Sequence, residues 1–146
     1  MNNAAETRTV VIERFMPHPA EKVWRALTQQ PLIEEWLMKN DFEPVKGRHF
    51  SLHTQPQPGW DGRIDCEVLA AEPHRLLTYT WNASVPGVSD DLRTVVTFTL
   101  DPTDGGVNLR MEQSGFRPSE ERAYQGAQYG WQHFFGKLET TLGKIA

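Results

Sequence analysis

The sequence predicts an α+β fold, in which a curved antiparallel sheet of about six strands wraps around a long C-terminal helix. Two observations lead to this class. Strand-like runs follow one another at close spacing through most of the 146 residues, and the last 28 residues change to helical periodicity. Hairpin-length connections favour antiparallel pairing over a series of βαβ units.

Six strand-like runs are separated by residues typical of turns. The first, 7–15, is rich in β-branched residues. The later runs are 48–54, 60–72, 75–84, 92–100 and 106–116. The connections between them read QPQPG, EPH, VPGVSDD and DPTDGG, and the last is typical of a hairpin turn.

Residues 17–37 predict two short helices between the first and second strands. Pro19 suits a first helical position, and Gln30-Pro31 marks a break. The apolar positions form one stripe on either side of that break: Val23, Trp24, Leu27, Ile33, Trp36 and Leu37. Helices this short are unstable alone in water, so we expect them to pack on a large apolar surface.

The C-terminal segment predicts one long helix with Ser119 as its N-cap and acidic residues in its first turn. Its apolar face recurs at spacings of three and four: Tyr124, Ala127, Trp131, Phe135, Leu138, Leu142 and Ile145. Gly126 and Gly130 lie beside this face, although an interior glycine costs about 1 kcal/mol against alanine. Two interpretations stay open: room for a ligand, or close backbone packing with a local bend.

Alternation along the strands predicts which side chains face the long helix. The inward set is mostly apolar: Ile64, Cys66, Val68, Leu77, Tyr79, Trp81, Thr94, Val96, Phe98, Leu100, Val107, Leu109, Met111 and Gln113. Four members, Cys66, Tyr79, Thr94 and Gln113, carry polar atoms.

Length and composition favour a single domain over 1–146, with 1–8 as a flexible tail. The net charge of −4, without a Lys/Arg run, argues against a nucleic-acid partner. The single cysteine excludes an internal disulfide and is compatible with a reducing cytosol. No signal peptide is recognisable, and no run approaches the ~20 apolar residues of a membrane helix. We therefore expect a soluble, cytoplasmic protein.

Four motifs in order carry a resemblance to a known family. They read RFMPHPAEKVWRALTQQPLIEEW, PHRLLTYTW, VVTFTLDPTDGGVNLRMEQSGF and SEERAYQGAQYGWQHFFGKLETTL. Over about 9–142, the chain resembles the bacterial Hsp90-ATPase-activator-homologue (AHSA1-like) family of the START-like, or Bet v 1-like (SRPBCC), superfamily. The resemblance implies a helix-grip fold, a cavity for hydrophobic small molecules between the long helix and the sheet, and a link to chaperones and the stress response.

We expect the protein to bind a hydrophobic or aromatic small molecule in that cavity. The candidate lining residues are Trp36, Phe50, Trp60, Cys66, Tyr79, Trp81, Thr94, Gln113, Phe116 and Tyr129. Tyr79, Gln113 and Thr94 would orient the ligand, and access would pass Trp36, Trp60 and 85–91. Trp24 and Trp131 are expected to be plain core.

The sequence points to no catalytic residue, cofactor or metal. Cys66 is expected to be a small buried side chain, and His49 and His53, about 13 Å apart along a strand, to face solvent. Two alternatives stay open: a chaperone-interaction module, and a cyclase- or hydrolase-type enzyme that uses Tyr79, Gln113 or Glu112. The chain is expected to be a monomer or a homodimer.

Overall fold

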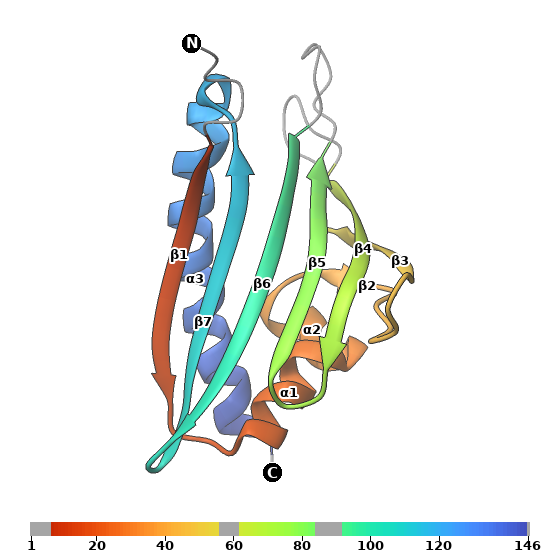
Figure 1. The fold of residues 1–146 in the computed structure, drawn as a ribbon. Coiled ribbons are helices and arrows are strands. Elements are labelled where there is room, and N and C mark those ends of the chain that lie inside the picture. Colours follow the sequence, from red (N-terminus) through yellow and green to blue (C-terminus); the bar gives the residue numbers. More distant parts are fainter. Residues whose placement is uncertain (1–6, 56–61, 84–91, 146) are drawn as a thin grey trace.

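The computed structural model describes residues 7–55, 62–83 and 92–145 (Figure 1). In chain order the elements are β1 (Arg8–Met16), α1 (Ala20–Thr28), α2 (Gln30–Trp36), β2 (Lys39–Asn40), β3 (His49–His53), β4 (Arg63–Glu72), β5 (Leu76–Ala83), β6 (Leu92–Thr103), β7 (Gly106–Phe116), a 3-10 turn (Pro118–Glu120) and α3 (Glu121–Lys144). This is the predicted succession of one strand, two short helices, further strands and a long helix.

The strands of the described residues form one antiparallel sheet with the order β1-β7-β6-β5-β4-β3-β2. The sheet has seven strands in place of about six, because the two-residue β2 is too short to leave a pattern in the sequence. The DPTDGG segment forms the expected hairpin, with Thr103 paired to Gly106. Gly105 has a φ of +82°, which a glycine adopts at little cost.

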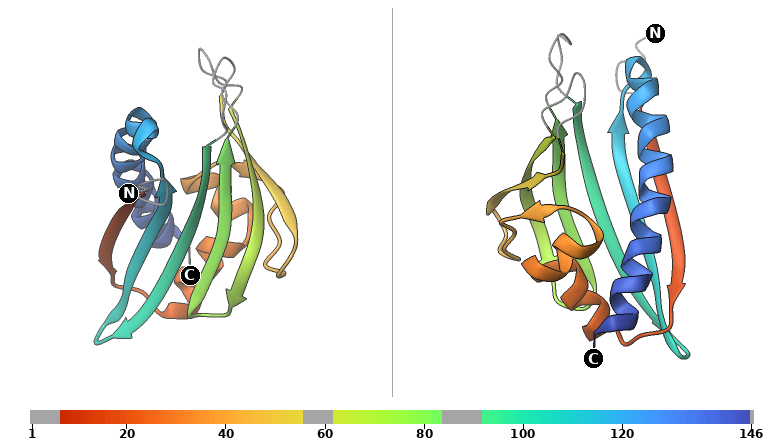
Figure 2. Two further views of the ribbon diagram at one scale, coloured as in Figure 1. Left: turned by 45° about the horizontal axis from the view of Figure 1, so that its top comes forward. Right: turned by 180° about the vertical axis from the view of Figure 1, so that it is seen from behind.

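The long helix α3 lies along the concave side of the sheet, over β1 and β7 (Figure 2). Helices α1 and α2 cover the same side near the C-terminal end of α3 and contact that helix. Together these features are the helix-grip fold that the resemblance implies. The N-terminal half of α3 has no such cover from α1 and α2.

A bulge in β4 changes the alternation of inward and outward side chains. Val68 pairs with Tyr79, but Ala70 pairs with Thr78, so one extra residue, Leu69, is accommodated in β4. Ile64, Cys66 and Val68 are buried on the inner face, whereas Leu69 is exposed. Bulges increase local twist and bending, which suits a sheet that curves around a helix.

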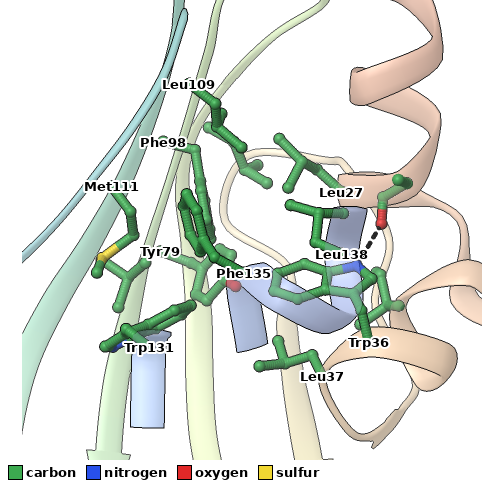
Figure 3. Close-up of a cluster of buried hydrophobic side chains, with 14 of the residues drawn as sticks. Leu27, Trp36, Leu37, Tyr79, Phe98, Leu109, Met111, Trp131, Phe135 and Leu138 are labelled. Atoms are coloured by element: carbon green, nitrogen blue, oxygen red, sulfur yellow. Dashed lines mark hydrogen bonds between the residues drawn. The ribbon is translucent and has the colours of Figure 1, made fainter. Parts of the chain in front are cut away.

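The core fills the space between the C-terminal half of α3, the helix pair and the sheet (Figure 3). Trp36 is 1% exposed, and its Nε1 donates a hydrogen bond of 2.8 Å to the carbonyl oxygen of Ala26. Its ring meets Phe98 edge to face, with the centroids 6.3 Å apart. The apolar stripe predicted for the helix pair therefore packs against this core, as expected.

Three predicted helix ends are wrong by one or two residues. Pro19 is the N-cap of α1 and precedes its first helical residue. The break between the short helices lies at Gln29, and Pro31 occupies the first turn of α2, where a missing N–H breaks no helical hydrogen bond. Ser119 lies in the 3-10 turn, and the N-cap of α3 is Glu120.

Candidate ligand-binding cleft

A mostly apolar cleft of about 390 Å³ lies between the N-terminal half of α3 and the inner face of the sheet. Its lining comes from the start of β4 and β6, the ends of β5 and β7, the segment after α2, and α3. The lining residues are Met38, Ile64, Trp81, Ala83, Leu92, Gln113, Phe116, Ala123, Gly126, Ala127, Gly130, Trp131 and Phe134. A concave apolar site with few polar groups is the usual form of a small-molecule site.

The cleft exists because one face of α3 carries small residues in its first half. Ala123, Gly126, Ala127 and Gly130 recur at spacings of three and four on the face turned to the sheet. On the same face, one turn further, the residues become large: Trp131, Phe134, Phe135 and Leu138. The large side chains reach the sheet and form solid core, whereas the small ones do not span the gap.

The glycines of α3 are not explained by close packing on the sheet. A Cβ added at Gly126 would meet nothing within 4 Å, and one added at Gly130 would meet only the Phe134 ring at 4.0 Å. Of the two interpretations left open by the sequence, the structure therefore supports the one in which these glycines leave room between helix and sheet.

Gln113 is the most polar side chain of the lining, and its amide is hydrogen-bonded on both sides. Its Oε1 accepts from Nε1 of Trp131 at 2.7 Å, and its Nε2 donates to Oγ1 of Thr94 at 2.9 Å. Thr94 in turn donates to the backbone carbonyl of Trp81 at 2.7 Å. Gln113 and Thr94 are each 2% exposed, so this chain of contacts satisfies polar atoms that burial would otherwise leave unpaired.

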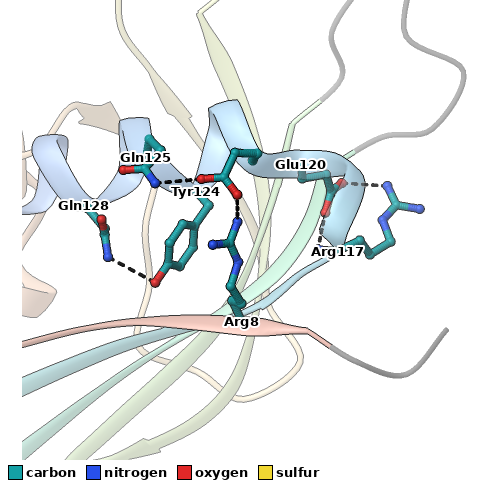
Figure 4. Close-up of polar contacts among 7 residues, drawn as sticks. Arg8, Arg117, Glu120, Tyr124, Gln125 and Gln128 are labelled. Atoms are coloured by element: carbon teal, nitrogen blue, oxygen red, sulfur yellow. Dashed lines mark hydrogen bonds and ion pairs between the residues drawn. The ribbon is translucent and has the colours of Figure 1, made fainter. Parts of the chain in front are cut away.

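Polar contacts hold the start of α3 in place beside β1 and β7 (Figure 4). Arg8 of β1 pairs with Glu121, and its guanidinium lies 3.9 Å from the ring centroid of Tyr124. Glu120 accepts hydrogen bonds from the backbone N–H and the side chain of Arg117, at 2.7 and 2.6 Å. Burial alone would raise the pKa of Glu120, but these Arg117 contacts outweigh it and lower that pKa.

Three of the residues predicted to line a cavity do so. Trp81, Gln113 and Phe116 contribute to the cleft, and Thr94 lies behind Gln113 through their hydrogen bond. Trp131 is 2% exposed and packs in the core as expected, but it also forms part of the cleft wall. Trp24 is buried as core, as expected.

Other candidates lie outside this cleft. Trp36 does not stand near its entrance, because it is fully buried against α1 and Phe98. Phe50 and Tyr79 pack together in an aromatic cluster deeper in the sheet, with their centroids 5.1 Å apart. Cys66 is buried nearby, and desolvation raises the pKa of its thiol and that of the Tyr79 hydroxyl.

The prediction that Tyr129 lines the cavity is wrong. Its side chain is 81% exposed, and it borders a separate, more polar hollow of about 420 Å³ between α3 and β1. Tyr129 follows Ala127 by two residues, which turns it by about 200° away from the lined face of the helix. Trp60 and 85–91, the other features assigned to the entrance, lie outside the described residues.

The groups considered for catalysis do not gather in the cleft. Glu112 points to the outer face of β7, opposite Gln113, and lies 3.4 Å from Arg110. Of Tyr79, Gln113 and Glu112, only Gln113 lines the cleft. His49 and His53 face solvent, as expected. Within 7–55, 62–83 and 92–145, no three His, Cys, Asp or Glu side chains are placed to hold a metal ion.

Comparison with known families matches the chain to the family described as Activator of Hsp90 ATPase homolog 1-like protein, over residues 17–143. The chain belongs to this family. The resemblance seen in the sequence motifs is therefore confirmed, and folds of this kind commonly bind hydrophobic ligands. No curated protein matches the chain.

Solved structures share the fold of this family member. Protein MLL2253 from Mesorhizobium loti is 57% identical, with a TM-score of 0.88, over 95% of this chain and 99% of that one. DynU16, from the dynemicin biosynthetic locus, is 25% identical, with a TM-score of 0.74, over 93% of this chain and 47% of that one. Protein BH1534 from Bacillus halodurans is 23% identical, with a TM-score of 0.75, over 92% of this chain and 96% of that one. At this level of identity, the likeness establishes only that the two proteins share a fold.

In the described part of the chain, every helix is too short or too polar to cross a membrane.

Proposed function

We propose that this family member reversibly binds a hydrophobic, aromatic small molecule in the cleft beneath the N-terminal half of α3. The observation that supports this function best is the lining itself, an apolar space of about 390 Å³. Among its described lining residues, Gln113 is the only side chain other than the tryptophans that carries N–H or O–H groups. Burial of apolar ligand surface would supply the affinity, at about 25 cal/mol per Å² before the costs of association.

The rings on the cleft wall favour an aromatic ligand over an aliphatic one. Trp81 and Trp131 have their centroids 5.3 Å apart, and Phe134 lies 5.5 Å from Trp131. Phe116 adds a fourth aromatic side chain to the lining. Such rings contact a planar ligand at its faces and edges, which adds to the gain from burial alone.

A matched pair of variants tests the proposal. Ala127→Phe would place a ring inside the cleft, whereas Gln128→Phe would place the same ring on the exposed side of α3. Native mass spectrometry of freshly purified protein would first detect any retained molecule. Fluorene would then be titrated against both variants and the unchanged protein, with tryptophan fluorescence as the readout because Trp81 and Trp131 line the cleft.

We expect saturable binding of fluorene to the unchanged protein and to Gln128→Phe, and a loss of at least tenfold in Ala127→Phe. Equal binding by both variants would place the ligand elsewhere on the molecule. The absence of saturable binding to the unchanged protein by fluorene or similar neutral aromatic compounds would contradict the proposed function.

The family description favours a second candidate function, contact with an Hsp90-type chaperone. The same variants separate it from ligand binding. A chaperone module would accelerate ATP hydrolysis by Hsp90 in a saturable manner, and Ala127→Phe would leave that acceleration unchanged because the cleft would be incidental to it.

A further inference from the structure

The hydrogen bonds around Gln113 determine the orientation of its amide in the cleft. The indole N–H of Trp131 can only donate, so the atom that it meets at 2.7 Å is the amide oxygen. Thr94 uses its hydroxyl hydrogen on the carbonyl of Trp81, so its oxygen accepts from the amide nitrogen. A flip of the amide is excluded because it would set donor against donor at Trp131.

This orientation leaves a donor available at the cleft. A primary amide nitrogen carries two N–H groups, and Thr94 accepts only one of them. Within the described ranges, the second N–H of Gln113 has no partner, although the side chain is 2% exposed and lines the cleft.

A ligand that accepts a hydrogen bond from Gln113 would therefore gain more in this cleft than a ligand that donates one. The oxygen of Gln113 keeps a second lone pair, but it already accepts a short bond from Trp131. Buried carbonyl oxygens with one lone pair unused are tolerated more often than buried N–H groups without a partner. A ligand atom that accepts from Gln113 would remove the larger cost.

We infer that Gln113 makes the cleft selective for planar aromatic molecules of two or three rings that carry a hydrogen-bond acceptor, such as a carbonyl oxygen. The size follows from the volume, because a cavity of about 150 Å³ holds one benzene ring and this cleft measures about 390 Å³. The inference rests on the proposed function and adds the residue that determines specificity.

Three tricyclic compounds of nearly equal shape test this selectivity. Fluorene has no strong polar group, 9-fluorenone adds a carbonyl acceptor, and carbazole adds an N–H donor. We expect 9-fluorenone to bind about 3- to 10-fold more tightly than fluorene, and carbazole to bind no more tightly than fluorene. In ¹H–¹⁵N spectra, 9-fluorenone alone should shift one side-chain amide proton of Gln113 downfield.

Gln113→Leu provides a second measurement, with the exposed Gln128→Leu as its matched control. The first variant should lose the preference for 9-fluorenone over fluorene, and the second should keep that preference. If Gln113→Leu does not fold, the series on the unchanged protein decides alone. Equal affinity for all three compounds would overturn the selectivity and leave the proposed function standing, whereas binding of none would overturn both.

Discussion

The indole nitrogen of Trp131 lies 2.7 Å from Oε1 of Gln113, and this contact joins the middle of α3 to β7. It stands at the boundary between two halves of the helix. On one side the large side chains of α3 fill the space above the sheet, and on the other the small ones leave the cleft. This polar contact therefore joins the helix to the sheet at the point where the apolar packing ends.

Removal of the Gln113 amide should destabilise the protein by about 1–3 kcal/mol, because Gln113→Leu leaves the buried indole N–H of Trp131 without its acceptor. Thr94→Val removes a neighbouring part of the same network. The double variant should cost less than the sum of the two single variants by at least 0.5 kcal/mol, since contacts in one network are not additive. Urea unfolding would measure all three.

A control for these variants is Gln128→Leu on the exposed face of α3, which should change stability by no more than about 0.5 kcal/mol. If Gln113→Leu costs no more than this control, the network contributes little and the helix is held above the sheet by apolar packing alone.

Alanine should stabilise the helix at Gly126 and at Gly136, by about 0.5–1 kcal/mol at each position, because neither added Cβ meets an atom within 4 Å. Gly126 faces the cleft and Gly136 faces solvent, so the second serves as the control for the first. Thermal unfolding of the two variants would measure the effect. A destabilising Gly126→Ala beside a stabilising Gly136→Ala would mean that the Cβ added at Gly126 meets a neighbouring atom, and hence that the helix lies close to the sheet there.

The long helix, the inward faces of the strands and the hairpin at 101–106 follow from the sequence because periodicity and turn chemistry are local properties. The register of β4 could not be predicted from the sequence, because the bulge at Leu69 arises from pairing with β5. A two-residue strand such as β2 carries no periodicity and is formed only by its pairing with β3.

The cleft was only partly predictable from the sequence. Trp81, Gln113 and Phe116 follow from strand alternation, but the placement of Trp36 depends on how α2 packs against α1. Room for a ligand at Gly126 and Gly130 was one of two interpretations that the sequence left open, and a further pattern on the helix favours it. Small residues at Ala123, Gly126, Ala127 and Gly130 share the face on which Trp131 lies, and the change from small to large along one helix face indicates where a gap begins.

Stability should fall as the pH rises above about 8.5, because burial raises the pKa of the Cys66 thiol above its value in the unfolded chain. The folded chain then holds a proton that the unfolded chain releases, so the neutral thiol contributes stability fully below the unfolded pKa and loses it above. The slope should approach about 1.4 kcal/mol per pH unit.

Urea unfolding between pH 7 and 10 would measure this slope in the unchanged protein and in Cys66→Ala, which should lack it. Tyr79→Phe serves as the comparison. The pKa of the Tyr79 hydroxyl is also raised by burial, but its unfolded value is near 10, so this variant should retain the slope that begins near pH 8.5. An identical slope in all three proteins would show that Cys66 ionises as readily in the folded chain as in the unfolded one.

Glu120→Gln should reduce stability at pH 7 by about 1 kcal/mol, since the amide weakens the two contacts with Arg117 that precede α3. The pKa of Glu120 is lowered in the folded chain, so its carboxylate contributes stability that is present above the unfolded pKa near 4.3 and is lost as the pH falls. The difference between the two proteins should therefore shrink from pH 5 to pH 3. Glu139→Gln, which breaks a more exposed pair with Arg14, should cost less at pH 7. Glu120 is the N-cap of α3, and the first half of this helix lies above the cleft. Glu120→Gln should therefore also weaken fluorene binding, whereas Glu139→Gln should not. Equal effects of both variants on binding would mean that the start of the helix does not shape the cleft.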